Sequence, residues 1–296
     1  MPETHRPVNL GAEQWLEKPI ECLDHGFVRL VDYMGDDSAI VQAARVSYGK
    51  GTKKANEDRG LIRYLLRHRH TTPFEMCELK FHCKMPIFVA RQWIRHRTAN
   101  VNEYSARYSV LDREFYLPEA LALKKQSMEN RQGRAEELTP EEQAKILTLM
   151  KSGNEAQYRD YEEFLRIGLA RELARIGISV SAYTQWYWKI DLHNLLHFLS
   201  LRMDEHAQWE IRVFAEAMAK IVKDAFPLVW EAFEDYRLNS MSLSRVEVEI
   251  LSEVGLVTSR FMDNDALRKY LNEKIGNKRE VEEFLKKFKT LNIQLG

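Results

Sequence analysis

The sequence predicts an α+β fold, a small and mostly antiparallel sheet packed with helices. Three segments are rich in β-branched and aromatic residues and partly alternate apolar with polar positions, as strands do: 27–34, 76–83 and 179–188. The segments between them repeat apolar residues every three or four positions, which indicates amphipathic helices. We therefore expect one main domain over residues 26–239, preceded by an N-terminal arm (1–25) and followed by a helical extension (240–296).

The first elements follow from turn and capping residues. The arm is polar and contains three prolines, so it is expected to be irregular. After the strand at 27–34, the run Gly35-Asp36-Asp37-Ser38 supplies caps for a helix from Ala39 to Arg45. The next helix begins near Asn56 and ends before Pro73, and its apolar stripe consists of Leu61, Ile62, Leu65 and Leu66.

The strand at 76–83 places its two cysteines on an apolar face. Its period of two puts Cys77, Leu79, Phe81 and Cys83 on one face and the polar residues, His82 among them, on the other. Cysteines in such a face behave as small hydrophobes and make poor thiolate nucleophiles. A metal site from Cys77, His82 and Cys83 is disfavoured because His82 points away from both cysteines.

The segment from Pro86 to Arg97 concentrates the cationic groups of the chain. On a helix beginning at Pro86, Arg91, Gln92 and Arg95 share one face. Like charges at this spacing indicate an anion site, because arginine binds phosphate or carboxylate bidentately. The alternative is a solvated basic face, but the apolar residues around Trp93 favour a half-buried helix that ends in an anion site.

The second half of the chain is mainly helical. Residues 119–139 read as a polar connector, and the capping box at Thr139 begins a long helix expected to stop at Gly177, with core contacts at Tyr158, Tyr161, Phe164 and Leu165. A further helix carries an apolar stripe of leucines from Leu192 to Leu199, and two more span 206–238, the second starting at Pro227. His193 and His197 lie on another face of the leucine-rich helix. They lack the glutamate of an H-E-x-x-H zinc motif, so ligand contact ranks above metal binding.

Composition limits the classes of partner. The 296 residues are 45% hydrophobic and 30% charged, with 44 basic and 44 acidic side chains, so no global field favours nucleic acid or an anionic membrane. Three cysteines are poor material for a disulfide framework, and no apolar run approaches membrane-spanning length. We expect a cytoplasmic protein whose anion recognition is local, with no nucleic-acid or membrane partner.

One signature gives the chain a family resemblance. Arg95-His96-Arg97, seven further residues and then Ser105 form the RHR-x7-S signature of the flavin-dependent thymidylate synthases. Four blocks resemble that family in the same order: 43–47, 70–75, 86–97 and 201–210. The resemblance covers about residues 26–236 and implies reductive methylation of dUMP to dTMP. The implied partners are FAD, NADPH as reductant and methylenetetrahydrofolate as carbon donor, in a homotetramer with sites shared between subunits and no metal.

The resemblance also implies roles for particular residues. The expected substrate-binding residues are Gln92, Trp93, Ile94, Arg95, Glu103, Tyr104, Ser105, Ala106, Arg107, Arg175 and Arg202. The expected cofactor-binding residues are His70, Thr72, Arg95, His96, Arg97, Asn102, Glu103, Asp191, Leu192, His193, His197 and His206. Some family members have asparagine, arginine and glycine where this chain has Asp191, His193 and Ala106, respectively.

The chemistry of the implied reaction singles out Arg202 as the catalytic residue. Carbon 5 of uracil becomes nucleophilic when N3 ionises, and a fixed guanidinium stabilises that anion without donating its proton, so no enzyme nucleophile is needed. An ion pair with Asp204 or Glu205 is the competing interpretation of Arg202. The alternative function is a single-stranded nucleic-acid-binding module that uses the patch from Arg91 to Arg107, with Trp93, Tyr104 and Tyr108 as stacking platforms.

Overall fold

The structure, a computed structural model, describes residues 7–46, 55–126, 134–246, 248–249, 257–258, 264–290 and 294–295. The chain divides into two compact units, Met1–Leu238 and Asn239–Gly296. No helix among the described residues has both the length and the apolarity that crossing a membrane requires. The first unit contains every residue that the sequence assigns to a site.

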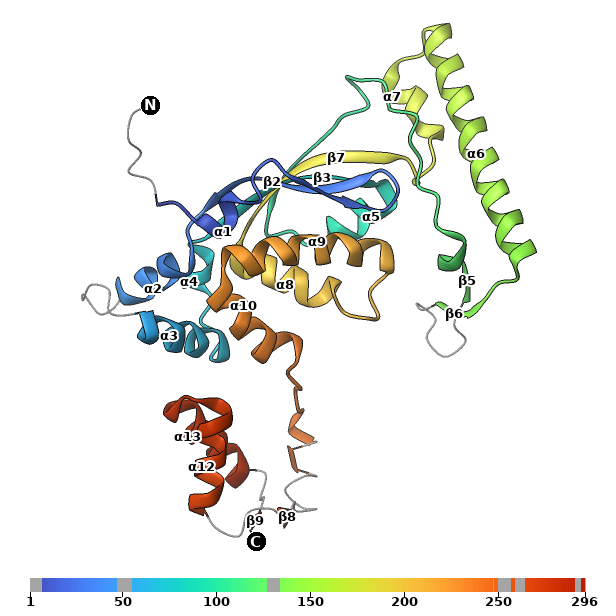
Figure 1. Ribbon diagram of the computed structural model, residues 1–296. Helices are drawn as coiled ribbons and strands as arrows, with labels where there is room; N and C mark the ends of the chain where they lie inside the picture. Colours follow the sequence, from blue (N-terminus) through green and yellow to red (C-terminus); the bar gives the residue numbers. More distant parts are fainter. Residues whose placement is uncertain are drawn as a thin grey trace. The chain divides into compact units, whose positions relative to one another are not determined.

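A five-stranded antiparallel sheet forms the centre of the first unit (Figure 1). Its strands, in spatial order, are β1 (Pro19–Cys22), β2 (Gly26–Met34), β3 (Glu78–Pro86), β7 (Tyr183–Asp191) and β4 (Asn100–Glu103). The longest register joins β3 to β7, from Glu78 opposite Asp191 to Pro86 opposite Tyr183. The α+β class and the antiparallel sheet are therefore confirmed.

The sequence did not predict the two short edge strands. All four residues of β4 are exposed, so its sequence carries no alternation of apolar and polar residues. β1 lies in the arm that was expected to be irregular, and α1 (Leu10–Glu13) precedes it. Both strands depend on pairing with a neighbouring strand, β2 or β7, rather than on their own composition.

Helices pack on the apolar face of the sheet. Alternate residues of β3 are buried, including Cys77 just before it and Cys83 within it, so the predicted two-residue period is confirmed. Figure 1 shows α8 and α9 side by side below the sheet, with α5 beside them. The bounds of these and the neighbouring helices are α2 (Asp37–Val46), α3 (Ala55–Arg67), α4 (Thr72–Glu75), α5 (Ile87–Trp93), α8 (Leu192–Arg202), α9 (Trp209–Ala225), α10 (Pro227–Phe233) and the π-helical turn η3 (Glu234–Leu238).

The long helix α6 (Pro140–Ile167) begins as predicted and ends earlier than predicted. Thr139 forms the capping box with Glu142, but Gly168 at φ 94° closes the helix before Gly177. The helix α7 (Arg171–Ala174) and the 3₁₀ turn η2 (Arg175–Gly177) follow. Tyr158 and Tyr161 are buried as expected, whereas Phe164 is 39% exposed and is not a core residue.

The remaining elements are small. The expected connector contains the 3₁₀ turn η1 (Ala120–Ala122) and a short hairpin of β5 (Lys124–Gln126) and β6 (Arg134–Glu137). In the second unit, α12 (Asn264–Ile275) and α13 (Lys278–Thr290) pack through Leu271 and Val281. The strands β8 (Val257–Thr258) and β9 (Gln294–Leu295) pair in parallel.

Candidate active site

The arginine-rich helix ends before its last arginines. α5 stops at Trp93, and the amide of Ile94, its C-cap, donates to the carbonyl of Ala90. The prediction that Arg91 and Arg95 share a helical face is therefore wrong, because Arg95 lies beyond the last turn. Pro86 is the N-cap rather than the first helical residue. The consequence is that Arg95, His96 and Arg97 lie on a turn from which all three side chains reach the same cavity.

Trp93 fixes the position of this turn. Its indole is fully buried, and its ring centroid lies 5.4 Å from Trp186, 5.2 Å from Trp188 and 5.0 Å from Phe198. The aromatic cluster joins α5 to β7 and α8. A ligand contact at Trp93 would have to come from its backbone, and its ring offers no stacking surface to a nucleic acid base.

A cavity of about 350 Å³ brings Arg95, His96 and Arg97 of the signature together with Arg202. Arg202 is the last residue of α8, so the end of that helix meets the turn after α5. The residues lining the cavity are Arg95, His96, Arg97, Thr98, Ile190, Asn194, His197, Leu201 and Arg202. Its size and its cationic groups suit part of an anionic ligand.

His96 and Arg202 form the central contact of this cavity. Nε of Arg202 donates to Nε2 of His96 at 3.0 Å, which assigns the proton of a neutral ring to Nδ1. Burial, and then the charges of Arg202 and His197, lowers the pKa of His96 to about 4. The imidazole is therefore a neutral acceptor at physiological pH, and it holds the guanidinium by one edge.

The terminal amino groups of Arg202 are left for a ligand. Within the part of the chain that the structure describes, no protein hydrogen bond or ion pair engages either of them. Among the described residues, Arg202 forms no ion pair with Asp204 or Glu205, which was the competing interpretation. Asp204 instead accepts from the backbone amide of His206 at 2.8 Å and contacts its Nδ1 at 2.9 Å. Burial lowers the pKa of Arg202, but a guanidinium remains charged at physiological pH.

A second group of expected site residues lies on the segment from β4 to Tyr108. Glu103 accepts from the hydroxyl of Thr184 at 2.7 Å, and the hydroxyl of Ser105 accepts from the amide of Arg107 at 3.3 Å. Arg107 lies 3.4 Å from Glu172, at the start of the same α7–η2 region that carries Arg175. These residues are not among those lining the Arg202 cavity, so a single chain presents two separate parts of the expected site.

The other expected residues divide between these groups and the protein interior. Gln92 donates to Gln208, and Tyr104 donates its hydroxyl to the carbonyl of Val110 at 2.8 Å. Leu192 is fully buried and Ala106 is 7% exposed, so their side chains pack inside. Tyr104 is exposed, and so are His70, Thr72, Ile94, Asn102 and His206.

Asp191 has a structural role that explains one departure from the family pattern. It is the N-cap of α8, where its carboxylate accepts from the backbone amide of Asn194 at 2.9 Å and from its side-chain amide at 2.8 Å. Both carboxylate oxygens are therefore engaged within the helix end. An aspartate caps a helix well without needing the donor that an asparagine would offer.

His197 connects the Arg202 cavity to a second cavity of about 290 Å³. His193, the other histidine of α8 singled out in the sequence, lines only this second cavity. Sequence reasoning missed Thr98 and Asn194 in the first cavity and Arg69 and Arg237 in the second. The only signal for the first three of these residues is that they lie next to expected site residues in the sequence. Arg237 is not close to any of them in the sequence. Among the described residues, no group of three or more His, Cys, Asp or Glu side chains could hold a metal ion.

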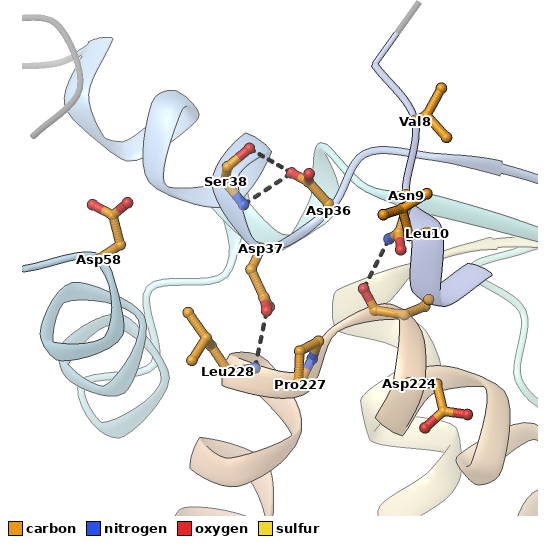
Figure 2. A pocket seen from close by; sticks show the side chains of 12 residues that line it. Val8, Asn9, Leu10, Asp36, Asp37, Ser38, Asp58, Asp224, Pro227 and Leu228 are labelled. Atoms are coloured by element: carbon orange, nitrogen blue, oxygen red, sulfur yellow. Dashed lines mark hydrogen bonds between the residues drawn. The ribbon is translucent and has the colours of Figure 1, made fainter. Parts of the chain in front are cut away.

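A third cavity, of about 450 Å³, has the opposite charge (Figure 2). It is lined by four aspartates, Asp36, Asp37, Asp58 and Asp224. Figure 2 shows the Asp37 carboxylate directed at the start of α10, where the amides of Leu228 and Val229 donate to it at 2.9 and 3.2 Å. Its acidic lining would repel a phosphate, so the smaller cationic cavity is better suited to an anionic ligand.

The fold and this site define an α+β protein in which arginines on a turn and at a helix end line one cavity. The model of the family "Thymidylate synthase complementing protein" (Thy1) matches residues 29–228. This chain belongs to that family, the flavin-dependent thymidylate synthases, as the signature predicted.

Relatives and solved structures agree with this assignment. The flavin-dependent thymidylate synthase of Gluconobacter oxydans is 61% identical over 81% of this chain and 80% of its own length. That of Rickettsia prowazekii is 52% identical over 98% of this chain and all of its own. A crystal structure of the UMP/dUMP methylase PolB from Streptomyces cacaoi with 5-Br dUMP superposes with a TM-score of 0.68 at 33% identity, covering 75% of this chain and 100% of that chain.

Proposed function

We propose that this enzyme converts dUMP to dTMP by reductive methylation, with methylenetetrahydrofolate as carbon donor, FAD as cofactor and NADPH as reductant. Family membership and the dUMP-analogue complex of the structural relative support the substrate. The observation that carries the mechanism is the contact between Arg202 and His96, which engages Nε of the guanidinium, while no described protein group engages its two terminal amino groups.

Arg202 promotes ionisation of the uracil ring at N3. Two parallel donors match N3 and an adjacent carbonyl oxygen, and the stabilised anion carries charge toward carbon 5. The contact with His96 keeps the guanidinium in place without adding a proton donor, because the low pKa of His96 leaves its imidazole neutral and Nε2 is the accepting atom. Carbon 5 can then take up the one-carbon unit without prior attack by an enzyme group.

No described cysteine is suited to that attack. Burial raises the pKa of Cys22 and of Cys77 to about 12, and it raises the pKa of the fully buried Cys83 as well. The hydroxyl of Ser105 contacts the amide of Arg107 and has no His–Asp pair beside it among the contacts described. A mechanism without an enzyme nucleophile fits this set of side chains.

The nucleotide phosphate is held by Arg95 and Gln92 together with Ser105, Arg107 and Arg175 from another subunit. The division of these residues between two parts of one chain supports a shared site. Apolar side chains that are more than a third exposed flank both parts, and they would be covered in a homotetramer. They are Ile94, Val101, Tyr104, Tyr108, Ile176 and Leu201.

The two cavities that meet at His197 fit the flavin dinucleotide. Their linings combine cationic side chains with apolar surface, the donor set that a ligand with two phosphates and two ring systems requires. Arg97, Asn194, His193 and His197 would hold it there. When bound, the flavin supplies the hydride that side chains cannot carry. Leu201 and Ile190 supply apolar surface to the first cavity.

The test is methyl transfer by the Arg202→Met and Arg202→Lys variants. We expect Arg202→Met to lose at least about a hundredfold in turnover, the usual effect of removing one stabilising donor group, while flavin absorbance is retained. Arg202→Lys should recover only a small part, because a lysine lacks the parallel donors. Wild-type turnover in Arg202→Met would overturn the mechanism. A wild-type protein that binds single strands in a salt-dependent way and forms no dTMP would favour the nucleic-acid alternative.

A further inference from the structure

The second cavity contains cationic groups that the family signature does not include. It lies between the end of α3, the outer face of α8 and the helices α10 and η3, and its floor is formed by Leu66, Leu196 and Phe233. The polar residues around this floor are Arg69, Thr71, His193, His197, Ser200 and Arg237. An apolar floor surrounded by guanidinium, imidazole and hydroxyl groups is typical of a nucleotide-binding surface.

Arg69 occupies a backbone position that favours glycine. The amide of His70 donates to the carbonyl of Leu65 and that of Arg69 to Leu66, which is the Schellman ending of α3. Arg69 is the left-handed residue of this motif, with φ 59°. A non-glycine residue in this conformation is strained, and strain of this kind concentrates at functional sites. The side chain at this position lines the second cavity.

Arg237 reaches the same cavity from a different element. It lies in the π-helical turn η3, and such turns occur frequently at functional sites. Burial, and then the charge of Arg69, lowers the pKa of Arg237, so the two guanidinium groups are close enough to repel each other. Two arginines from distant segments that face one cavity are stabilised when an anion lies between them.

We propose that Arg69 and Arg237 form a phosphate subsite for the pyrophosphate of the flavin dinucleotide, beside His193 and His197. This inference rests on the proposed function and extends it to two residues outside the signature. The subsite adds two guanidinium charges to the cavity that His193 lines. His197 lines both cavities, so a ligand that extends past it would contact Arg202 in one and Arg69 in the other.

The experiment uses Arg69→Gly, which removes the cation and also relieves the left-handed strain. The full-length flavin-free variant is titrated with FAD and with riboflavin, which has no phosphate, and binding is followed by flavin fluorescence. We expect FAD to bind about tenfold more weakly than to the wild type, with riboflavin affinity unchanged, because only FAD carries the anion. The melting temperature should stay equal or rise, since glycine suits the position. A structural role for Arg69 would instead lower the melting temperature.

Matched variants separate this subsite from charge in general. Arg59→Gln removes an exposed arginine of the same helix that pairs with Glu231 and does not line the cavity, so its FAD affinity should equal the wild type. Arg237→Gln should weaken FAD as Arg69→Gly does, and Arg237→Lys should restore part of the affinity. Equal FAD affinity in Arg69→Gly and the wild type would overturn the subsite. A wild type that binds no flavin would instead refute the proposed function.

Discussion

The neutral state of His96 is a sharp consequence of the site geometry. Burial is the main reason that its pKa falls to about 4, and the charges of Arg202 and His197 add to it. At pH 5.5 a histidine with the ordinary pKa of 6.5 is about 90% protonated, whereas one with a pKa near 4 is about 3% protonated. The pH is therefore lowered from 7.5 to 5, and the protonated fraction of the His96 imidazole is measured.

The assay is NMR of the flavin-free protein with ¹³C-labelled histidine, and His96→Gln identifies the signal. We expect the His96 resonance to stay at its neutral position down to pH 5. In Arg202→Met the midpoint should move up only in part, because burial, the larger cause, is still present. A midpoint at or above pH 6 in the wild type would refute the view that His96 accepts the bond from Arg202 as a neutral ring.

The same shift sets the sign of a stability effect. Since the folded pKa of His96 lies below the unfolded value, this group contributes stability above pH 6.5 and loses it as the pH falls toward 4. The full shift corresponds to about 3 kcal/mol, and because solvent screens a half-buried ring we expect about 1–2 kcal/mol. In urea unfolding between pH 7 and 5, the free energy of unfolding of the wild type should approach that of His96→Gln as the pH falls.

Three further predictions concern the rest of the fold. Burial raises the pKa of Asp37 to about 6, so its ionised form lowers stability above pH 6, and this cost disappears as the pH falls toward 3.8. Asp37→Asn should therefore be about 1 kcal/mol more stable than the wild type at pH 8 and lose that advantage at pH 5, as denaturant unfolding at both pH values will show. Asp37→Ala should instead lose the hydrogen bonds that cap α10. Native protein treated with iodoacetamide at pH 8 should keep Cys22 and Cys77 unmodified by mass spectrometry, because their thiols are buried and protonated. Trp93→Ala should lower the free energy of unfolding by about 3–5 kcal/mol in urea, and an unchanged midpoint would show that the aromatic cluster does not anchor the turn after α5.

Local sequence patterns predicted the elements whose residues alternate between buried and exposed positions along the chain. The period of two placed Cys77 and Cys83 on the buried face of the central strand, and the capping box placed the start of α6 at Thr139. The end of α6 was misjudged because two glycines, Gly168 and Gly177, offered a stop, and only the backbone conformation distinguishes them. The edge strand β4 was missed because no residue in it is buried.

The site shows the same division between local and distant information. The resemblance at Arg95-His96-Arg97 and at Arg202 was enough to name a family that the comparisons confirm. Residues that only support others, such as Thr184 beside Glu103 and Gln208 beside Gln92, come from segments far along the chain. No pattern within one segment predicts such a pair.

The sequence by itself determined the class of fold, the family and the types of chemical group available, because each of these is written in spacing and composition over short distances. Tertiary structure decided which groups meet. It ended α5 at Trp93 so that Arg95 leaves the helix, and it placed Arg202 against His96. It also brought Arg69 and Arg237 to one cavity. The physical reason is that the pKa of a side chain and the direction of a guanidinium depend on burial and on neighbours supplied by other elements.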